Sequence, residues 1–340
     1  MSQTFAARKK ELLPDQAARK IFGLIGTEMA LVEAEYQRQA SSNIQVINYV
    51  GDYLRASGGK RVRPALLVLS SLAAGGRGDT DSVIRMATVM EMLHTATLVH
   101  DDIIDNADLR RSRSSVNARF GNQAAVLMGD WLYMSAFETA LKQRSLEILD
   151  ILTKLTRQMT EGELIQLTML GNSKITEEQY FDIVKRKTAY LFSGCCEIGA
   201  ILAGSSSEKQ AALRDFGMNL GVAFQLADDL FDFTADEKTI GKAAGSDLLE
   251  GKMTLPLIRL IKSDKAVQPI LENIMDEGIY AEKARNDINQ RLRDLNIIDA
   301  TKRMAAEFGE AARKSLEVLP ETEYRFALDA VPNFVIRRTS

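Results

Sequence analysis

Cysteine is nearly absent from this chain of 340 residues, which excludes a fold held together by disulfides. The two cysteines, Cys195 and Cys196, are adjacent, which is poor geometry for a disulfide, and no metal-ligand spacing accompanies them. We expect both to be small core residues. This cysteine usage fits a reducing, cytoplasmic setting.

Long apolar runs, a strong net charge and flexible linkers are also missing. No run approaches the roughly 18 to 20 residues that a membrane-spanning helix needs, and residues 1–11 lack the apolar core of a secretory signal. A net charge of −3 gives no reason to expect nucleic-acid binding. We therefore expect neither a transmembrane helix nor a nucleic-acid partner.

Long stretches of helix-forming residues are what the sequence does contain. Only 6 prolines and 22 glycines interrupt them, and strand-like alternation is nearly absent. A long helix is expected from a cap at Asp79-Thr80-Asp81 to residue 101, and others at 65–73, 123–144, 146–171, 176–202, 207–233 and 253–261. The prediction is a single all-α domain over residues 1–340, a helical bundle with its core at about 17–325.

The motif Asp-Asp-x-x-Asp occurs twice, each time after an apolar helical stretch. The six residues are Asp101, Asp102, Asp105, Asp228, Asp229 and Asp232. Residues four apart lie on one face of a helix, so each motif should point a pair of carboxylates in one direction. Clustered carboxylates repel unless a cation neutralises them, and Mg²⁺ prefers a few carboxylates plus substrate phosphates. One copy alone would be weak evidence, but two copies predict a two-sided magnesium site for a phosphorylated substrate.

Basic residues accompany both motifs, and several follow a glycine. They are Lys60, Arg63, Arg110, Arg111, Lys187, Lys242 and Lys252. Each alone would be an ordinary solvated turn or exposed residue. Beside the acidic motifs, these cations and glycine turns suit diphosphate oxygens.

His94 and His100 are the only histidines. Glu91 and His94 form half of the Glu-x-x-His ligand set of a di-iron bundle, but the residue three before His100 is Thr97, so that interpretation fails. His94 lies two helical turns before Asp101, which suits a donor to a second phosphate; a lone histidine is more often structural.

These motifs together resemble the trans-isoprenyl diphosphate synthases, specifically the long-chain polyprenyl type that makes octaprenyl to decaprenyl products. The resemblance runs from about residue 17 to beyond residue 256 and rests on GGKRVRP, HTATLVHDDIIDNADLRR, GNQAAVLMGDWLY, the KT of VKRKTAYLF, FQLADDLFD and GSDLLEGKMTLP. It implies an isoprenoid-synthase helical bundle around a central cavity, a homodimer, and Mg²⁺ at about three ions per active site.

The resemblance also implies a role for each motif residue. Asp101, Asp105 and Asp228 would be the main Mg²⁺ ligands, with Asp102, Asp229 and Asp232 binding directly or through water. Isopentenyl diphosphate would be held by Lys60, Arg63, His94 and Arg111. The allylic diphosphate would be held by Arg110, Lys187, Gln225 and Lys242, with Lys252 nearby, and Thr188 would line the reacting carbons. Departure of the diphosphate leaves an allylic cation that isopentenyl diphosphate attacks, and the departed diphosphate then accepts the proton.

The resemblance further implies that product length depends on the residues one turn before the first motif. In short-chain relatives bulky aromatics there block elongation, whereas this chain has Ala96 and Thr97. We therefore expect a C40 to C50 product, a precursor of a quinone side chain, with Met134 and Phe137 further down the cavity. A transient membrane contact during product release is left open.

Two other classes are weighed against this enzyme. A non-catalytic partner subunit usually loses an acidic motif, and this chain keeps both. A terpene cyclase or head-to-head condensing enzyme would not need the second-substrate group Lys60, Arg63 and His94. The sequence favours the synthase.

Overall fold

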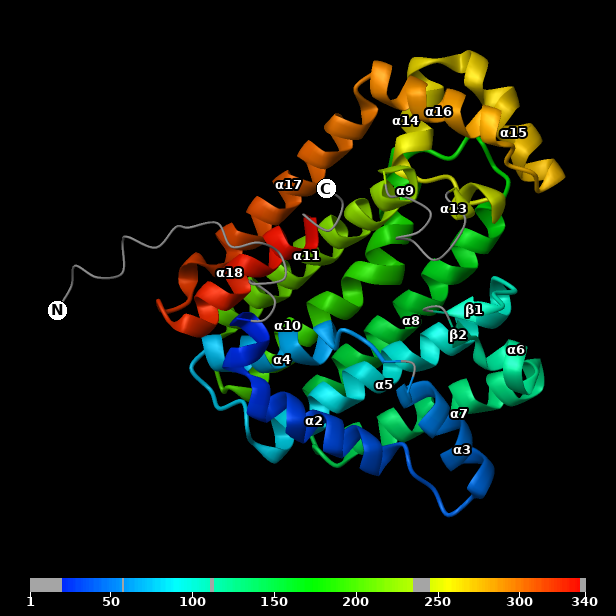
Figure 1. The fold of residues 1–340 in the computed structure, drawn as a ribbon. Coiled ribbons are helices and arrows are strands. Elements are labelled where there is room, and N and C mark those ends of the chain that lie inside the picture. Colours follow the sequence, from blue (N-terminus) through cyan, green and yellow to red (C-terminus); the bar gives the residue numbers. More distant parts are fainter. Residues whose placement is uncertain (1–19, 57, 111–112, 235–244, 337–340) are drawn as a thin grey trace.

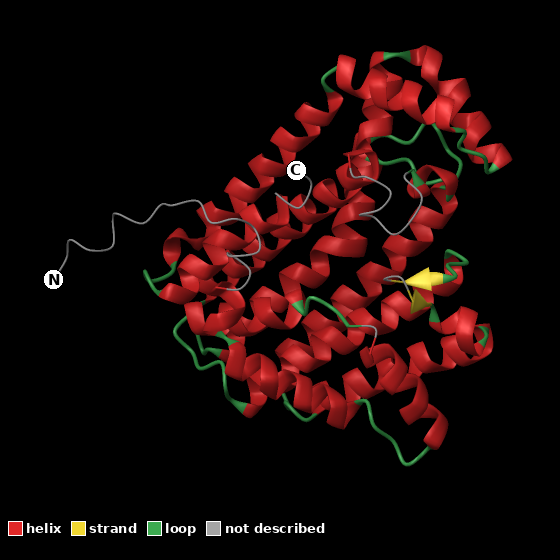
Figure 2. Ribbon diagram, in the orientation of Figure 1, coloured by secondary structure: helices red, strands yellow, loops and turns green. Residues whose placement is uncertain are grey.

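The computed structural model describes residues 20–56, 58–110, 113–234 and 245–336. Its α-helices are α2 (Gly26–Gln39), α3 (Gln45–Ala56), α4 (Val62–Ala73), α5 (Asp81–Ile104), α6 (Val116–Phe120), α7 (Asn122–Leu141), α8 (Leu146–Met169), α9 (Glu177–Val184), α10 (Tyr190–Leu202), α11 (Ser207–Thr234), α13 (Ser246–Leu249), α14 (Leu255–Ser263), α15 (Gln268–Glu277), α16 (Glu282–Asp294), α17 (Ile297–Ser315) and α18 (Glu323–Ile336). Short strands β1 (Leu109–Arg110) and β2 (Arg113–Ser114) form an antiparallel ribbon. The all-α prediction is confirmed, as Figure 2 shows.

Local sequence signals explain where several helices begin. Thr80 caps α5, and its side chain accepts a hydrogen bond from the Val83 backbone N–H, as the Asp-Thr-Asp cap predicts. Thr176 and Gln179 form a reciprocal capping box at the start of α9. Pro256 lies in the first turn of α14, where its missing N–H costs nothing. Capping residues and a first-turn proline, which can be recognised in the sequence, therefore determine where these helices begin.

The prediction of one regular helix over residues 176–202 needs correction, because the structure divides this segment. α9 runs into a π-helical turn, η1 (Lys185–Ala189), before α10 resumes regular helix. A π-turn places an extra residue in one turn, and such turns are often found at functional sites. The periodicity of apolar residues did not reveal this insertion.

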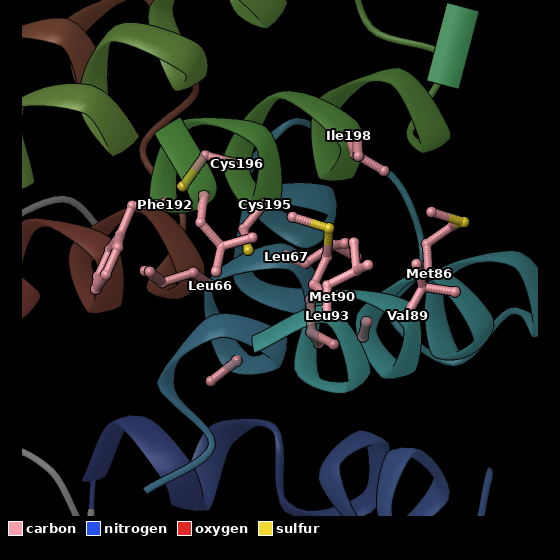
Figure 3. Packing of buried hydrophobic residues seen from close by; sticks show 14 of the residues in the cluster. Leu66, Leu67, Met86, Val89, Met90, Leu93, Phe192, Cys195, Cys196 and Ile198 are labelled. Carbon is pink, nitrogen blue, oxygen red and sulfur yellow. The ribbon is translucent and has the colours of Figure 1, made fainter. Parts of the chain in front are cut away.

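The main core lies where α4, α5 and α10 meet. Leu66, Leu67, Met90 and Phe192 are at most 1% exposed, and burying each such side chain contributes about 1.5 to 3 kcal/mol. Figure 3 shows Cys195 and Cys196 of α10 pointing into this packing. Both are free and fully buried, so the expectation of small core residues is confirmed.

The two helices that carry the acidic motifs end on the same side of the molecule. Figure 1 shows α5 ending beside the β1–β2 ribbon and α11 ending near α9 and α13. A second core cluster, with residues of α9, α11, α14, α16 and α17, supports the end of α11. In the part of the chain that the structure describes, no helix is long and apolar enough to span a bilayer.

Candidate active site

The first acidic motif lies where α5 ends. Asp105 is the C-cap residue, and its backbone N–H donates to the Asp101 carbonyl at 2.8 Å. Asn106 follows in the left-handed region at φ 50°, which ends the helix. Asp101 and Asp105 are both half-buried and lie one turn apart, as their spacing predicts.

Asp102 differs from its neighbours, because it points into the protein. It is 3% exposed, and the Arg110 guanidinium of β1 donates to its Oδ1 from both Nε and Nη2 at 2.6 Å. The structure therefore pairs an expected metal ligand with an expected diphosphate ligand. Arg111, the next residue, lies outside the described residues.

The second acidic motif, on α11, is also divided. Asp228 is exposed, whereas Asp229 and Asp232 are 3% and 8% exposed. Tyr180 donates to one oxygen of Asp229 at 2.5 Å, Gln225 donates to the other at 2.8 Å, and the Gly245 N–H donates to Asp232 at 3.0 Å. Asp228 and Asp232 lie one turn apart on α11, but the segment from Gly245 covers Asp232 and leaves only Asp228 exposed.

The π-helical turn η1 presents Lys187 and Thr188. The Lys187 ammonium lies 2.5 Å from Glu163 and 2.7 Å from Gln166, both on α8. Thr188 donates to Gln225 at 2.9 Å. A chain of hydrogen bonds thus joins Thr188 through Gln225 to the second acidic motif.

Two cavities meet at Lys187. The large cavity, of about 580 Å³, is lined by Thr97, His100, Asp101, Ile104, Asp130, Tyr133, Met134, Met159, Thr160, Glu163 and Lys187. The small cavity, of about 140 Å³, has polar lining from Gln166, Lys187, Thr188, Gln225, Asp229, Asp247 and Lys252. Lys187 therefore lies between the first motif, at the large cavity, and the second, at the small one.

A direct ion pair also links the two halves of the site. Lys252 donates to Asp105 at 3.0 Å and to Glu250 at 2.6 Å. Burial opposes its positive charge, but these two carboxylates still raise the pKa of Lys252. A charged lysine thus neutralises part of the first motif. Lys242, the other lysine expected here, lies outside the described residues.

Two of the acids are strongly perturbed. Burial, with smaller contributions from Glu163 and Asp105, raises the pKa of Asp101 to about 6 against the opposing charge of Lys187. Burial also raises the pKa of Asp229 to about 7, although hydrogen bonds from Tyr180 and Gln225 oppose the shift. Strongly shifted groups in a cavity mark a candidate functional site.

The group expected to hold a second phosphate lies where α4 begins and meets α5. Lys60 is exposed just before α4, Arg63 is in its first turn, and His94 is half-buried on α5. The Arg63 guanidinium lies 5.0 Å from the centre of the Phe192 ring. Arg61, between the two cations, donates to Glu91 of α5 at 2.8 Å, which brings this group together.

The expected chain-length residues lie around the large cavity to different degrees. Thr97 and Met134 line it. Phe137 stacks on Tyr133, with ring centres 6.5 Å apart, and Tyr133 lines the cavity. Ala96 is fully buried and is not among the lining residues. Of the two positions before Asp101, Thr97 faces the open space.

Several site residues were missed by sequence reasoning. Glu163 and Gln166 are three apart on one face of α8, Tyr180 lies two turns before Lys187, and Asp247 lines the small cavity. Helical spacing could have paired Glu163 with Gln166. Asp247 lies within the motif GSDLLEGKMTLP, in which this residue was assigned no role, and burial raises its pKa well above the usual value.

The donor set fits Mg²⁺ held together with a diphosphate. Asp101, Asp105 and Asp228 supply carboxylate oxygens from two helix ends, whereas the oxygens of Asp102 and Asp229 accept bonds from protein donors. Among the residues that the structure describes, no three acidic, histidine or cysteine side chains converge into a closed metal cage. Mg²⁺ commonly binds through one or two carboxylates plus substrate phosphates, so these carboxylates fit Mg²⁺ only together with a bound diphosphate.

Comparison with known proteins gives consistent matches. Residues 44–293 match the family model described as Polyprenyl synthetase. The chain is 37% identical over 323 residues to octaprenyl diphosphate synthase of Escherichia coli strain K12, covering 94% of this chain and 98% of the relative. A polyprenyl synthase from Caulobacter crescentus CB15, complexed with calcium and isoprenyl diphosphate, matches with a TM-score of 0.89 and 34% identity over 95% of this chain and 98% of that one. A decaprenyl diphosphate synthase from Rhodobacter capsulatus matches with a TM-score of 0.89 and 31% identity over 95% and 99%.

Proposed function

Because the chain belongs to the polyprenyl synthetase family and is a prenyltransferase, we propose that it condenses isopentenyl diphosphate head to tail onto an allylic diphosphate. Repeated condensation would give an all-trans C40 to C50 product suited to a quinone side chain. The observation that carries this proposal is the position of Lys187. This residue lines both cavities, of which the large one is also lined by Asp101 of the first acidic motif and the small one by Asp229 of the second.

The site residues would divide the work between binding and positioning. Mg²⁺, held by Asp101, Asp105 and Asp228, would neutralise charge on the departing diphosphate. Lys187 would exchange Glu163 and Gln166 for diphosphate oxygens, since an ammonium bonds strongly to an anionic acceptor. Thr188 would line the reacting carbons, and Gln225 would help to hold the allylic diphosphate, with Asp229 and Tyr180 keeping Gln225 in place.

The proposed condensation breaks one bond, forms another and releases one proton. The carbon–oxygen bond of the allylic diphosphate breaks, and its electron pair leaves with the diphosphate. The double bond of isopentenyl diphosphate then attacks the allylic carbon, and the departed diphosphate takes the proton that is lost. The apolar part of the large cavity, including Ile104, Met134 and Met159, would receive the growing chain.

Three further features belong to the proposal. A homodimer is supported by exposed apolar side chains on α7, among them Leu127 and Met134. Thr97 and Ala96, with Met134 and Phe137, would set the product length. Buried, unpaired cysteines are consistent with a cytoplasmic location.

Product analysis tests the function. Purified protein is incubated with Mg²⁺, farnesyl diphosphate and labelled isopentenyl diphosphate, and the dephosphorylated products are sized by chromatography. We expect labelled C40 to C50 chains and no incorporation after complete chelation of divalent ions. No incorporation by the protein alone would favour a non-catalytic subunit, and a cyclic product without label would favour a cyclase.

A further inference from the structure

Arg61 makes more buried contacts than a residue in a solvated basic turn would. Its side chain is 18% exposed and its guanidinium donates to Glu91 at 2.8 Å and to Glu33 at 3.1 and 3.3 Å. The same guanidinium lies 5.3 Å from the centre of the Tyr36 ring. Arg61 thus joins α2, the start of α4 and α5.

The backbone of Arg61 is also unusual. Its φ of 49° and ψ of 36° lie in the left-handed region, which a non-glycine residue adopts only where its surroundings compensate for the strain. Gly58, three residues earlier, has a φ of 69°. The turn before α4 therefore contains two residues with positive φ, Gly58 and Arg61. The contacts of the Arg61 side chain stabilise the second of these conformations.

Glu91 connects Arg61 to the part of α5 that carries His94. Glu91 is 5% exposed, and a buried carboxylate is stable only when it is paired. It lies one helical turn before His94 on the same face of α5. Arg61 lies between Lys60 and Arg63, so its pair with Glu91 connects the two chain segments that carry Lys60, Arg63 and His94.

We propose that Arg61, acting through Glu91, is a positioning residue for isopentenyl diphosphate. It does not touch the substrate. It fixes the distance between the turn that carries Lys60 and Arg63 and the helix that carries His94. This inference rests on the proposed function, because it assigns these three residues to the second diphosphate.

The two carboxylate partners of Arg61 allow a matched comparison, because they lie on different helices. Arg61→Lys keeps the charge but loses the planar fork that reaches two carboxylates. Glu91→Gln removes the link to α5, whereas Glu33→Gln weakens only the link to α2, where Glu33 is 44% exposed. Arg313→Lys, on α17, changes a similarly buried arginine whose partners Glu310, Asp329 and Asn333 lie on α17 and α18.

Steady-state kinetics and direct binding test the proposal. We expect Arg61→Lys and Glu91→Gln each to raise the KM for isopentenyl diphosphate about tenfold, with kcat and the allylic KM within about twofold of wild type. Calorimetric binding of isopentenyl diphosphate should weaken by the same factor. The double variant should be no worse than either single variant, because both break one link. Glu33→Gln and Arg313→Lys should leave both KM values unchanged.

Three results would overturn the inference. In the first, the KM values for both substrates rise and Tm falls, which would indicate that the substitution destabilises the whole fold. Glu33→Gln could have the same effect as Glu91→Gln, or isopentenyl diphosphate could bind all variants equally. Turnover by the wild-type protein separates this from the proposed function: wild type without turnover overturns the function, and wild type without binding overturns both. If Arg61→Lys does not fold, Glu91→Gln alone decides.

Discussion

Six aspartates of identical chemistry occupy unlike surroundings in this site. Asp102 and Asp229 are buried and accept bonds from arginine, tyrosine and glutamine, whereas Asp101 lines the large cavity and Asp105 accepts a bond from Lys252. A buried carboxylate without hydrogen-bond donors would become protonated. The partners of Asp102 and Asp229 therefore help to keep these side chains ionised and hold them in one position. The pattern Asp-Asp-x-x-Asp therefore mixes positioning residues with candidate metal ligands.

The raised pKa of Asp229 predicts how the stability of the metal-free protein depends on pH. A carboxyl group whose pKa is about 7 in the folded protein, against its usual 3.8, binds its proton more tightly when folded. Its contribution is fully present below about pH 4 and is lost as the pH rises through about 7, on the order of a few kcal/mol. We expect Tm to fall between pH 5.5 and 8 in wild type and to fall less in Asp229→Asn.

Thermal unfolding monitored by circular dichroism without added metal checks this. Asp215→Asn changes an exposed aspartate of the same helix and should keep the wild-type slope. Equal slopes in wild type and Asp229→Asn would contradict the assignment of the shift to Asp229.

Thr97 gives a second prediction at this scale, on product length. Its side chain lines the large cavity one turn before Asp101, so a phenyl ring there fills the space that the growing chain needs. We expect Thr97→Phe to shorten the product toward C15 to C20, as measured by product chromatography. Ala96→Phe should shorten it too, but with a lower Tm, because overpacking a fully buried site costs about 1 to 3 kcal/mol.

Thr97→Val is the matched control, since it keeps nearly the same volume and replaces only the hydroxyl, which donates to the His94 carbonyl, with a methyl group. It should leave the product length unchanged. Full-length product from Thr97→Phe would show that the growing chain does not pass this residue.

Among the elements, the π-helical turn η1 depends on a glycine in the facing helix. A Cβ on Gly162 of α8 would lie 2.7 Å from the Arg186 Cβ and 3.0 Å from the Lys187 backbone N. Gly162→Ala should therefore push η1 away and displace Lys187. We expect kcat/KM for the allylic substrate to fall at least about tenfold, and stability to fall by about 1 to 3 kcal/mol.

Gly26→Ala provides the comparison, because a Cβ there meets nothing within 4 Å. It should be neutral or slightly stabilising at the start of α2. Wild-type kcat/KM in Gly162→Ala would mean that close packing against η1 does not position Lys187.

These elements also show how far the sequence alone reaches. Asp101 and Asp105 were predictable one turn apart, and Thr80 as a cap, because helical spacing and capping are local. The π-turn was not predictable, since it depends on α8 approaching closely at Gly162. Nor was the Asp102–Arg110 pair, because which acid turns inward depends on packing.

At the scale of the whole molecule, one face of α7 leaves apolar side chains exposed at a regular interval. Leu127, Met134 and Leu141 are 68%, 63% and 48% exposed and lie seven residues apart. A seven-residue apolar repeat is the spacing at which two helices pack along a common seam. Met134 also lines the large cavity, so a second copy packed on this seam would cover part of the cavity that receives the product.

We therefore expect Leu127→Asp to convert a homodimer into a monomer, measured by light scattering coupled to size exclusion. A buried unpaired charge in the seam costs several kcal/mol, whereas Leu31→Asp, at a 43% exposed position on α2, should remain dimeric. Because the monomer would lose the cover beside Met134, its products should also change in length distribution. A wild-type monomer would contradict the homodimer, and a dimer that survives Leu127→Asp would place the interface elsewhere. A monomer with unchanged products would show that the cavity is complete within one chain.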